Sequence, residues 1–144
     1  MKILISKTNV QLLNKLYDDY YNYEIGGVLL GKIFGKDISI TDIVYNINRD
    51  KLNQNKYVRK VSDIKNIMMD TIVKSNHEID YIGEWHTHIG LNSMYSSVDK
   101  KAMNELNEDF PELILLIKSK VKISTFLFTR DNIKKIKIKV LEDI

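Results

Sequence analysis

Short apolar runs recur along the chain, some alternating with polar residues and some continuous, and they predict strands. We expect these strands at residues 2–5, 26–33, 38–47, 80–89, 112–119, 120–130 and 133–141. Between them, apolar residues recur at helical spacing and predict helices at residues 9–23, 62–76 and 96–109. The mixture of two periods favours an α/β or α+β sandwich around one central sheet.

Residues that commonly cap helices stand near the start of each helical segment. Ser6 or Thr8 can cap the first helix, and Ser62 and Ser96 can cap the other two. Tyrosines at the end of the first helix are expected to close it against the core, together with its apolar face: Val10, Leu13, Leu16 and Tyr17, then Tyr20, Tyr21 and Tyr23. The second helix has an apolar stripe formed by Ile64, Ile67, Met68 and Ile72. The polar segment 48–57 has neither period and predicts a loop.

Length and composition describe an ordinary globular chain. Its 144 residues are enough to bury a core, so we expect a single domain over residues 1–144. Cysteine is absent, so His, Asp, Glu or water would have to hold any metal. No apolar run approaches the roughly 20 residues of a membrane span, and the short polar N-terminus is unlike a signal peptide. We therefore expect a cytoplasmic protein with no membrane partner.

The charge of the chain gives little indication of a partner. A formal net charge of +3 is too small to predict binding to nucleic acid. Lysines crowd together near the end of the chain, at Lys134, Lys135, Lys137 and Lys139. This cluster is typical of a solvated edge strand that lysines protect from unwanted pairing, and a phosphate-binding patch is the alternative.

Two of the three histidines, His86 and His88, stand two residues apart in a predicted strand. They project from one face of it, about 6.6 Å apart along the strand. Ser96 then starts a helix, and Asp99 in its first turn can reach back towards the strand end. Two imidazoles, one carboxylate and a vacant fourth position describe a catalytic zinc site, where bound water has a pKa of about 7. Alternatively, Asp99 only completes the helix cap of Ser96, and the histidine pair is structural or exposed.

A metal hydrolase also needs an acid that moves protons between water and the leaving amine. Glu24 is a candidate because it stands at the edge of the buried run IGGVLLG, where a carboxylate has little structural reason to be. Glu84 is the rival, since it shares a strand face with His86 and His88, and its alternative role is to orient an imidazole. His77 lacks such neighbours and is expected at the surface near a helix end.

These residues resemble the JAMM motif of the JAB/MPN metalloproteases, H-x-H-x7-S-x2-D, which His86, His88, Ser96 and Asp99 match in order. The upstream EIGGVLLG resembles the segment that carries the catalytic glutamate of that family, at Glu24 here. The resemblance implies an α/β/α sandwich around a mixed, curved sheet of the kind found in cytidine deaminases. The phrase YIGEWHTH is most similar to a bacterial subgroup found beside E1- and E2-like genes, some of them in antiphage operons with cGAS-like nucleotide cyclases.

The activity implied by the resemblance is that of a zinc-dependent isopeptidase or peptidase. It would act at the C-terminus of a ubiquitin-like protein or of a similarly conjugated target, whose tail lies extended against a strand edge. His86, His88 and Asp99 would bind Zn²⁺, and Glu24 would be the general acid/base. The hydroxyl of Ser96 would steady the tetrahedral intermediate.

One residue departs from the family pattern. Ile89 stands where the family usually has proline, and its flexibility is expected to loosen the loop that follows. Three other functions remain open: a metal-free MPN scaffold that binds partners, a relative of DNA-repair JAB proteins, and a zinc hydrolase for a sulfur-carrier protein or small conjugate. The DNA-repair proteins carry HNHPSG where this chain reads HTHIGL. In the loop itself, Leu91, Met94 and Tyr95 could contact a substrate.

Overall fold

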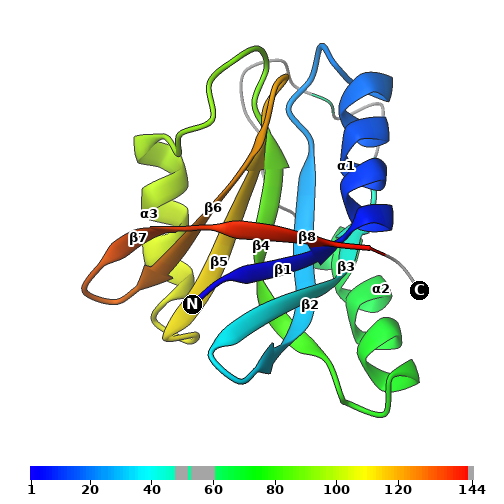
Figure 1. The fold of residues 1–144 in the computed structure, drawn as a ribbon, viewed down its shortest axis with the longest axis vertical. Helices are drawn as coiled ribbons and strands as arrows, with labels where there is room; N and C mark the ends of the chain where they lie inside the picture. Colours follow the sequence, from blue (N-terminus) through cyan, green and yellow to red (C-terminus); the bar gives the residue numbers. More distant parts are fainter. Residues whose placement is uncertain (48–51, 53–60, 143–144) are drawn as a thin grey trace.

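The computed structural model describes residues 1–47, 52 and 61–142, which form three helices and one eight-stranded mixed sheet (Figure 1). The helices are α1 (Lys7–Asp19), α2 (Val61–Lys74) and α3 (Ser97–Leu106). The strands are β1 (Ile3–Ser6), β2 (Gly26–Phe34), β3 (Asp37–Tyr45), β4 (Asp80–Thr87), β5 (Glu112–Lys118), β6 (Ile123–Thr129), β7 (Ile133–Ile136) and β8 (Ile138–Leu141). Their order across the sheet is β7-β6-β5-β4-β2-β3-β1-β8. The expected mixed sheet is confirmed, because β4 and β5 run parallel while β2 and β4 run antiparallel.

Helices cover both faces of the sheet. Leu13 of α1 packs in the same cluster as Trp85 of β4, on one face. On the other face, Ile64 of α2 packs against β2 and β3, and Met103 of α3 packs against β5 and β6. Neighbouring residues of β2 belong to different clusters, as strand alternation requires. The predicted α/β/α sandwich is therefore confirmed.

The C-terminal segment forms two short strands, not the single strand expected over residues 133–141. β7 pairs antiparallel with β6, and β8 pairs parallel with β1, so one segment is bonded to both ends of the sheet (Figure 1). The change of partner falls at Lys137, whose carbonyl accepts a hydrogen bond of 2.9 Å from the Ile3 N–H. The sheet must curl for both ends to reach this segment. The clustered lysines are exposed there, as expected of solvated end strands.

The end of the first helix differs from the prediction. Ser6 caps α1, and its hydroxyl accepts a backbone hydrogen bond of 3.1 Å, but the helix ends one residue before Tyr20. Tyr20 packs against the core. Tyr21 and Tyr23 are 61% and 36% exposed, so the expectation that they close the helix against the core is wrong. The physical reason is that the chain turns after Asp19 and no longer presents a helical face to the sheet.

The apolar stripe of α2 is narrower than predicted. Ile64 and Ile72 are buried and Met68 packs against them, whereas Ile67 is 42% exposed. Ile64, Met68 and Ile72, which are spaced four residues apart, thus face the sheet. Ile67, three residues after Ile64, lies at the side of the helix.

One expectation lies outside the described residues: the loop at residues 48–57, of which only Leu52 is described. α2 begins at Val61, so Ser62 lies inside the helix and not at its cap as expected. His77 is exposed just beyond the end of α2, as expected. None of the helices in the described ranges is both long and apolar enough to cross a bilayer.

Candidate metal centre

From Glu84 onwards, strand β4 presents its even-numbered residues to the face that carries α2 and α3. Glu84 is the register partner of Val28 on one side and of Leu115 on the other, and both lie in clusters packed under these helices. α2 contacts β2 and β3, and α3 contacts β6, so β4 runs between the areas that the two helices cover. His86 and His88 follow on the same face and are only 6% and 7% exposed.

The histidine strand is held rigidly by its surroundings. Trp85 is fully buried on the opposite face, and its indole N–H donates a hydrogen bond of 3.0 Å to the Val44 carbonyl. β4 is paired with β2 and β5 on its two sides. At its end, the His88 N–H donates to the Lys118 carbonyl at 3.0 Å. A central strand fixed in this way gives the imidazoles well-defined positions.

Asp99 reaches the histidines from the first turn of α3. Ser96 caps this helix, and its hydroxyl accepts a hydrogen bond of 3.0 Å from the Asp99 N–H. The Asp99 carboxylate returns the interaction by accepting 2.8 Å from the Ser96 N–H, which completes a capping box. The sequence left open whether Asp99 serves the cap or the histidines. The structure shows that the Asp99 Oδ2 atom contacts both the Ser96 N–H of the cap and the two imidazoles.

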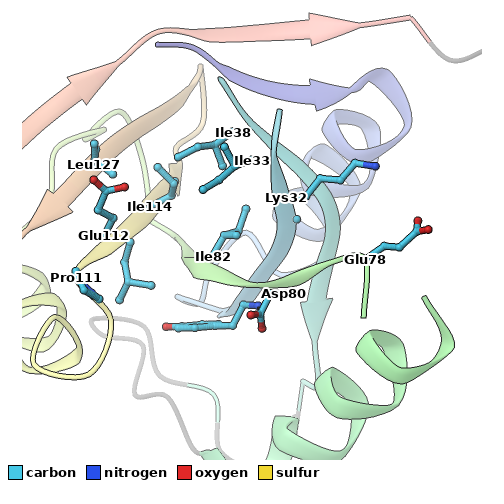
Figure 2. Close-up of a pocket in the computed structure, with 13 residues that line it drawn as sticks. Lys32, Ile33, Ile38, Glu78, Asp80, Ile82, Pro111, Glu112, Ile114 and Leu127 are labelled. Carbon is cyan, nitrogen blue, oxygen red and sulfur yellow. The ribbon is translucent and has the colours of Figure 1, made fainter. Parts of the chain in front are cut away.

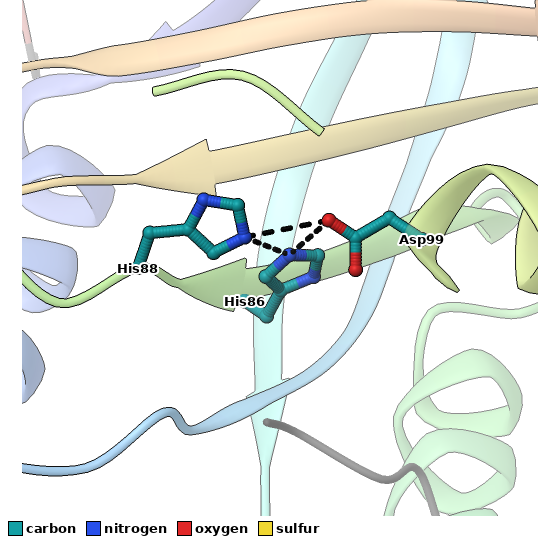
Figure 3. A group of neighbouring side chains, drawn as sticks. All are labelled: His86, His88 and Asp99. Atoms are coloured by element: carbon teal, nitrogen blue, oxygen red, sulfur yellow. Dashed lines mark hydrogen bonds and ion pairs between the residues drawn. The ribbon is translucent and has the colours of Figure 1, made fainter. Parts of the chain in front are cut away.

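The three candidate ligands point towards one another (Figure 3). The His86 and His88 Nε2 atoms lie 3.0 Å apart, and each lies 3.3 Å from the Asp99 Oδ2 atom. A tetrahedral zinc ion with bonds of about 2.0–2.1 Å separates its ligand atoms by roughly 3.3 Å. The donor set and its spacing therefore fit a zinc ion with three protein ligands and a fourth position for water or substrate.

Electrostatics in the centre favour a charged carboxylate. Burial alone would raise the pKa of Asp99, but hydrogen bonds from His86 and His88 and from the Ser96 backbone hold this pKa far below its usual range. The hydrogen bond to Asp99 raises the pKa of His88, although burial opposes this effect. A permanent anion beside two imidazoles is a suitable environment for a divalent cation.

Glu24 lies beside the same centre. Gly26 of β2 is the register partner of His86, and continuing this antiparallel register by two residues places Glu24 opposite His88. The Thr87 N–H donates 2.8 Å to the Ile25 carbonyl, so the strands remain together at this point. The negative charge of Glu24 also contributes to the raised pKa of His88. Glu24 and the three candidate ligands thus come from two strands and a helix that meet at one end of β4.

A match to a known family was found for most of the chain. Residues 10–131 match the model of the Prok-JAB family, described as prokaryotic homologues of the JAB domain. The chain belongs to this family. It is 28% identical over 139 residues to a protein of Escherichia coli (strain TW11681) named CD-NTase/cGAS isopeptidase. The matched region covers 96% of this chain and 89% of that relative.

The fold of this Prok-JAB chain is similar to that of a solved protein. The solution structure of DSY2949 from Desulfitobacterium hafniense superposes with a TM-score of 0.77, at 17% sequence identity, and covers 99% of this chain and 94% of that one. At this identity the likeness concerns the fold alone.

A tyrosine that sequence reasoning missed contacts the second carboxylate of β4. The hydroxyl of Tyr81 donates to the Glu84 Oε2 atom, and Glu84 is 6% exposed. Strict alternation would place residues 81 and 84 on opposite faces. A bulge in the pairing with β2 changes this, because Gly83 pairs with Leu29 while Tyr81 pairs with Leu30. Nothing in the local sequence predicts this bulge, so Tyr81 could not have been identified.

A groove of about 430 Å³ runs from the candidate metal centre along α3. Glu84, His86 and Asp99 line one part of it. Leu115 of β5 adds an apolar side chain, and α3 lines most of the rest with four more: Val98, Ala102, Met103 and Leu106. Two exposed carboxylates also line the groove, from Glu105 of α3 and from Asp109 just beyond the helix. The Prok-JAB centre thus opens into a partly apolar groove that also carries acidic groups.

A larger cavity of about 630 Å³ lies near the start of β4, at the other end of the strand from the histidines. Figure 2 shows Ile38 and Ile114 above Ile82 in this view, and Lys32 and Glu78 at the right. It has none of the three candidate ligands in its lining. The chemistry of this Prok-JAB chain is therefore expected at the smaller groove.

Proposed function

We propose that this chain is a zinc-dependent isopeptidase or peptidase that cleaves at the C-terminus of a ubiquitin-like protein or a similarly conjugated target. The observation that carries this proposal is the mutual spacing of 3.0–3.3 Å among one Asp99 oxygen and the Nε2 atoms of His86 and His88. Membership of the Prok-JAB family and similarity to a relative named as an isopeptidase support it. We further propose that the chain acts as one domain, in the cytoplasm.

We assign each side chain of the centre a role in this reaction. His86, His88 and Asp99 would hold the zinc ion. When bound, zinc polarises a carbonyl and activates water at neutral pH. Glu24 would accept a proton from the attacking water and deliver it to the leaving amine, as the C–O bond forms and the C–N bond breaks. The Ser96 hydroxyl would donate a hydrogen bond to the oxygen that becomes negatively charged.

The substrate would approach along the groove beside α3. An extended tail exposes backbone groups and alternate side chains, which an apolar groove with polar edges can accept. The relative is named CD-NTase/cGAS isopeptidase. A nucleotidyltransferase of that kind, joined through its C-terminal tail to another protein, is therefore among the substrates to test. If this chain's gene stands beside E1- and E2-like genes, as in the similar bacterial subgroup, those enzymes would form such a conjugate and this chain would remove it.

A cleavage assay with fusion proteins tests the proposal. The zinc-loaded chain is incubated with green fluorescent protein fused to the C-terminus of a ubiquitin-like protein or of a CD-NTase. We expect Glu24→Gln to abolish cleavage while one zinc ion per chain remains bound, and His86→Ala to lose both. The matched control is His77→Asn, because this histidine is exposed and precedes the start of β4, at the other end of the strand from the candidate ligands. Its φ is +59°, a backbone conformation that asparagine tolerates better than alanine.

Several outcomes would contradict the proposal. A wild-type chain that purifies without zinc, takes up none and cleaves neither fusion would be a scaffold of the same fold. If Glu24→Gln cleaves at the wild-type rate and Glu84→Gln does not, the proton shuttle is Glu84 and our assignment of Glu24 is wrong.

A further inference from the structure

The loop between His88 and Ser96 connects two of the three candidate ligands, and its first turn is held by residues outside the metal centre. The N–H of Gly90 donates a hydrogen bond of 3.3 Å to the hydroxyl oxygen of Tyr17. The Gly90 carbonyl accepts one of 2.8 Å from the Lys120 N–H. Gly90 has a φ of +82°, which L side chains rarely adopt. The turn is therefore bonded on both sides and depends on glycine for its backbone conformation.

Tyr17 belongs to α1, on the face of the sheet opposite the histidines. Its side chain is only 9% exposed, and the Lys118 ammonium lies 4.8 Å from the centre of its ring. Lys118 is 5% exposed, its ammonium donates to the Ser119 carbonyl, and its own carbonyl accepts the hydrogen bond from the His88 N–H. The tyrosine is thus packed against the same end of β5 that holds the histidine backbone.

We propose that Tyr17 is a positioning residue for the metal centre. Its hydroxyl fixes the turn at Gly90 and so restrains the segment that links His88 to Asp99. Tyr95, near the far end of this segment, packs edge-on against Phe126 with ring centres 5.1 Å apart. The segment is therefore anchored at both ends, and the ligands it joins are held close together before any metal binds. This inference rests on the proposed zinc site.

The expected magnitude follows from the loss of one neutral hydrogen bond. Such a loss corresponds to about a two- to tenfold change in an equilibrium constant. Without the tyrosine hydroxyl, the turn opens more often, and the linking segment loses more conformational freedom when a metal draws His88 and Asp99 together. The zinc dissociation constant should rise by that factor, roughly two- to tenfold.

Tyr17→Phe in the full chain tests this inference, because it removes the hydroxyl and keeps the ring packed. We expect zinc to bind about two- to tenfold more weakly in chelator competition, and the Gly90 amide to exchange faster by a similar factor in metal-free protein. The matched control is Tyr21→Phe, whose exposed hydroxyl lies beyond the same helix and should change neither quantity. Adding Ile89→Pro to Tyr17→Phe should restore zinc affinity, because proline fixes φ at the start of the same turn.

The two readouts separate this inference from the proposed function. Wild-type exchange at Gly90 in Tyr17→Phe would show that the hydroxyl does not hold the turn. Faster exchange with unchanged zinc affinity would show that the turn does not position the ligands. Either result overturns the inference. If the wild-type chain binds no zinc, the proposed function and the positioning role both fail, and the exchange rate still reports whether the hydrogen bond exists.

Discussion

Ser96 is expected to serve both the stability of α3 and the reaction, and two substitutions can separate these roles. Its hydroxyl oxygen accepts the Asp99 N–H at 3.0 Å, which leaves the hydroxyl proton to be donated elsewhere. Ser96→Ala removes both functions. Ser96→Gly also removes the hydroxyl, but glycine is a good N-cap and retains most of the stability of the cap. In both variants the Ser96 backbone N–H can still hold the Asp99 carboxylate.

The magnitudes differ clearly between the two variants. Replacing an N-cap serine by alanine costs about 1 kcal/mol of unfolding free energy, and by glycine only a few tenths. For a domain of this size, 1 kcal/mol lowers the melting temperature by roughly 3–5 °C. Loss of a hydrogen-bond donor to the developing oxyanion lowers turnover by a factor on the order of ten to a thousand. We therefore expect equal losses of turnover but unequal losses of stability.

Thermal unfolding and fusion cleavage, measured on the same zinc-loaded preparations, test this reasoning. Zinc content must be equal in all samples, so that turnover reports chemistry and not occupancy. If Ser96→Gly keeps turnover within about twofold of wild type, far less than an oxyanion donor is worth, the serine is only a helix cap. If alanine and glycine lower the melting temperature equally, the capping box does not stabilise α3 as its geometry indicates.

Three further predictions follow from the site and its support. Glu84→Gln should lower turnover less than Glu24→Gln does, in the same cleavage assay, because the Tyr81 hydroxyl donates to the Glu84 carboxylate and would compete with water for it. In metal-free protein, the raised pKa of His88 contributes stability that is complete below pH 6.5 and is lost as pH rises through the folded pKa. Since zinc needs the neutral imidazole, its addition should raise the melting temperature more at about pH 8 than at about pH 6, as calorimetry would show. Gly27→Ala should unfold the chain or destabilise it by on the order of 3 kcal/mol in denaturant titrations, since the new Cβ would lie 1.9 Å from a carbonyl oxygen of β3.

Local patterns were enough to predict most elements of this fold. The alternation in β4 and the apolar runs of β2 and β5 identified central strands, because burial on both faces demands them. The division of residues 133–141 was not predictable. Its two halves have similar composition, and the break arises because one half reaches β6 and the other reaches β1. The pairing partner of each half depends on how the whole sheet curls, and a local sequence pattern does not predict that curl.

The candidate site shows the same division between local and distant causes. The His86–His88 pair was predictable from strand periodicity, and the cap at Ser96 from its residue type. The contact of Asp99 with both histidines required the family resemblance, because nothing local fixes how α3 lies against β4. The hydrogen bond from Gly90 to Tyr17 spans 73 positions of sequence and joins the loop after β4 to α1. The only indication in the sequence is Ile89, which stands where the family usually has proline. Without proline, the loop has to be restrained by another contact.

The arrangement of the site also indicates what zinc would contribute. Apolar side chains on both faces already join the sheet to the helices, for example Leu13 with Trp85 and Met103 with Phe126, and these contacts need no metal. Asp99 is fixed by the helix cap, and His88 by its backbone bond to Lys118. A cation would therefore compete with protons on ligands that are already in place, and would not have to assemble them. This is the behaviour expected of a reactive metal site with an open position, and it differs from that of a structural zinc site, whose chain folds only when the metal binds.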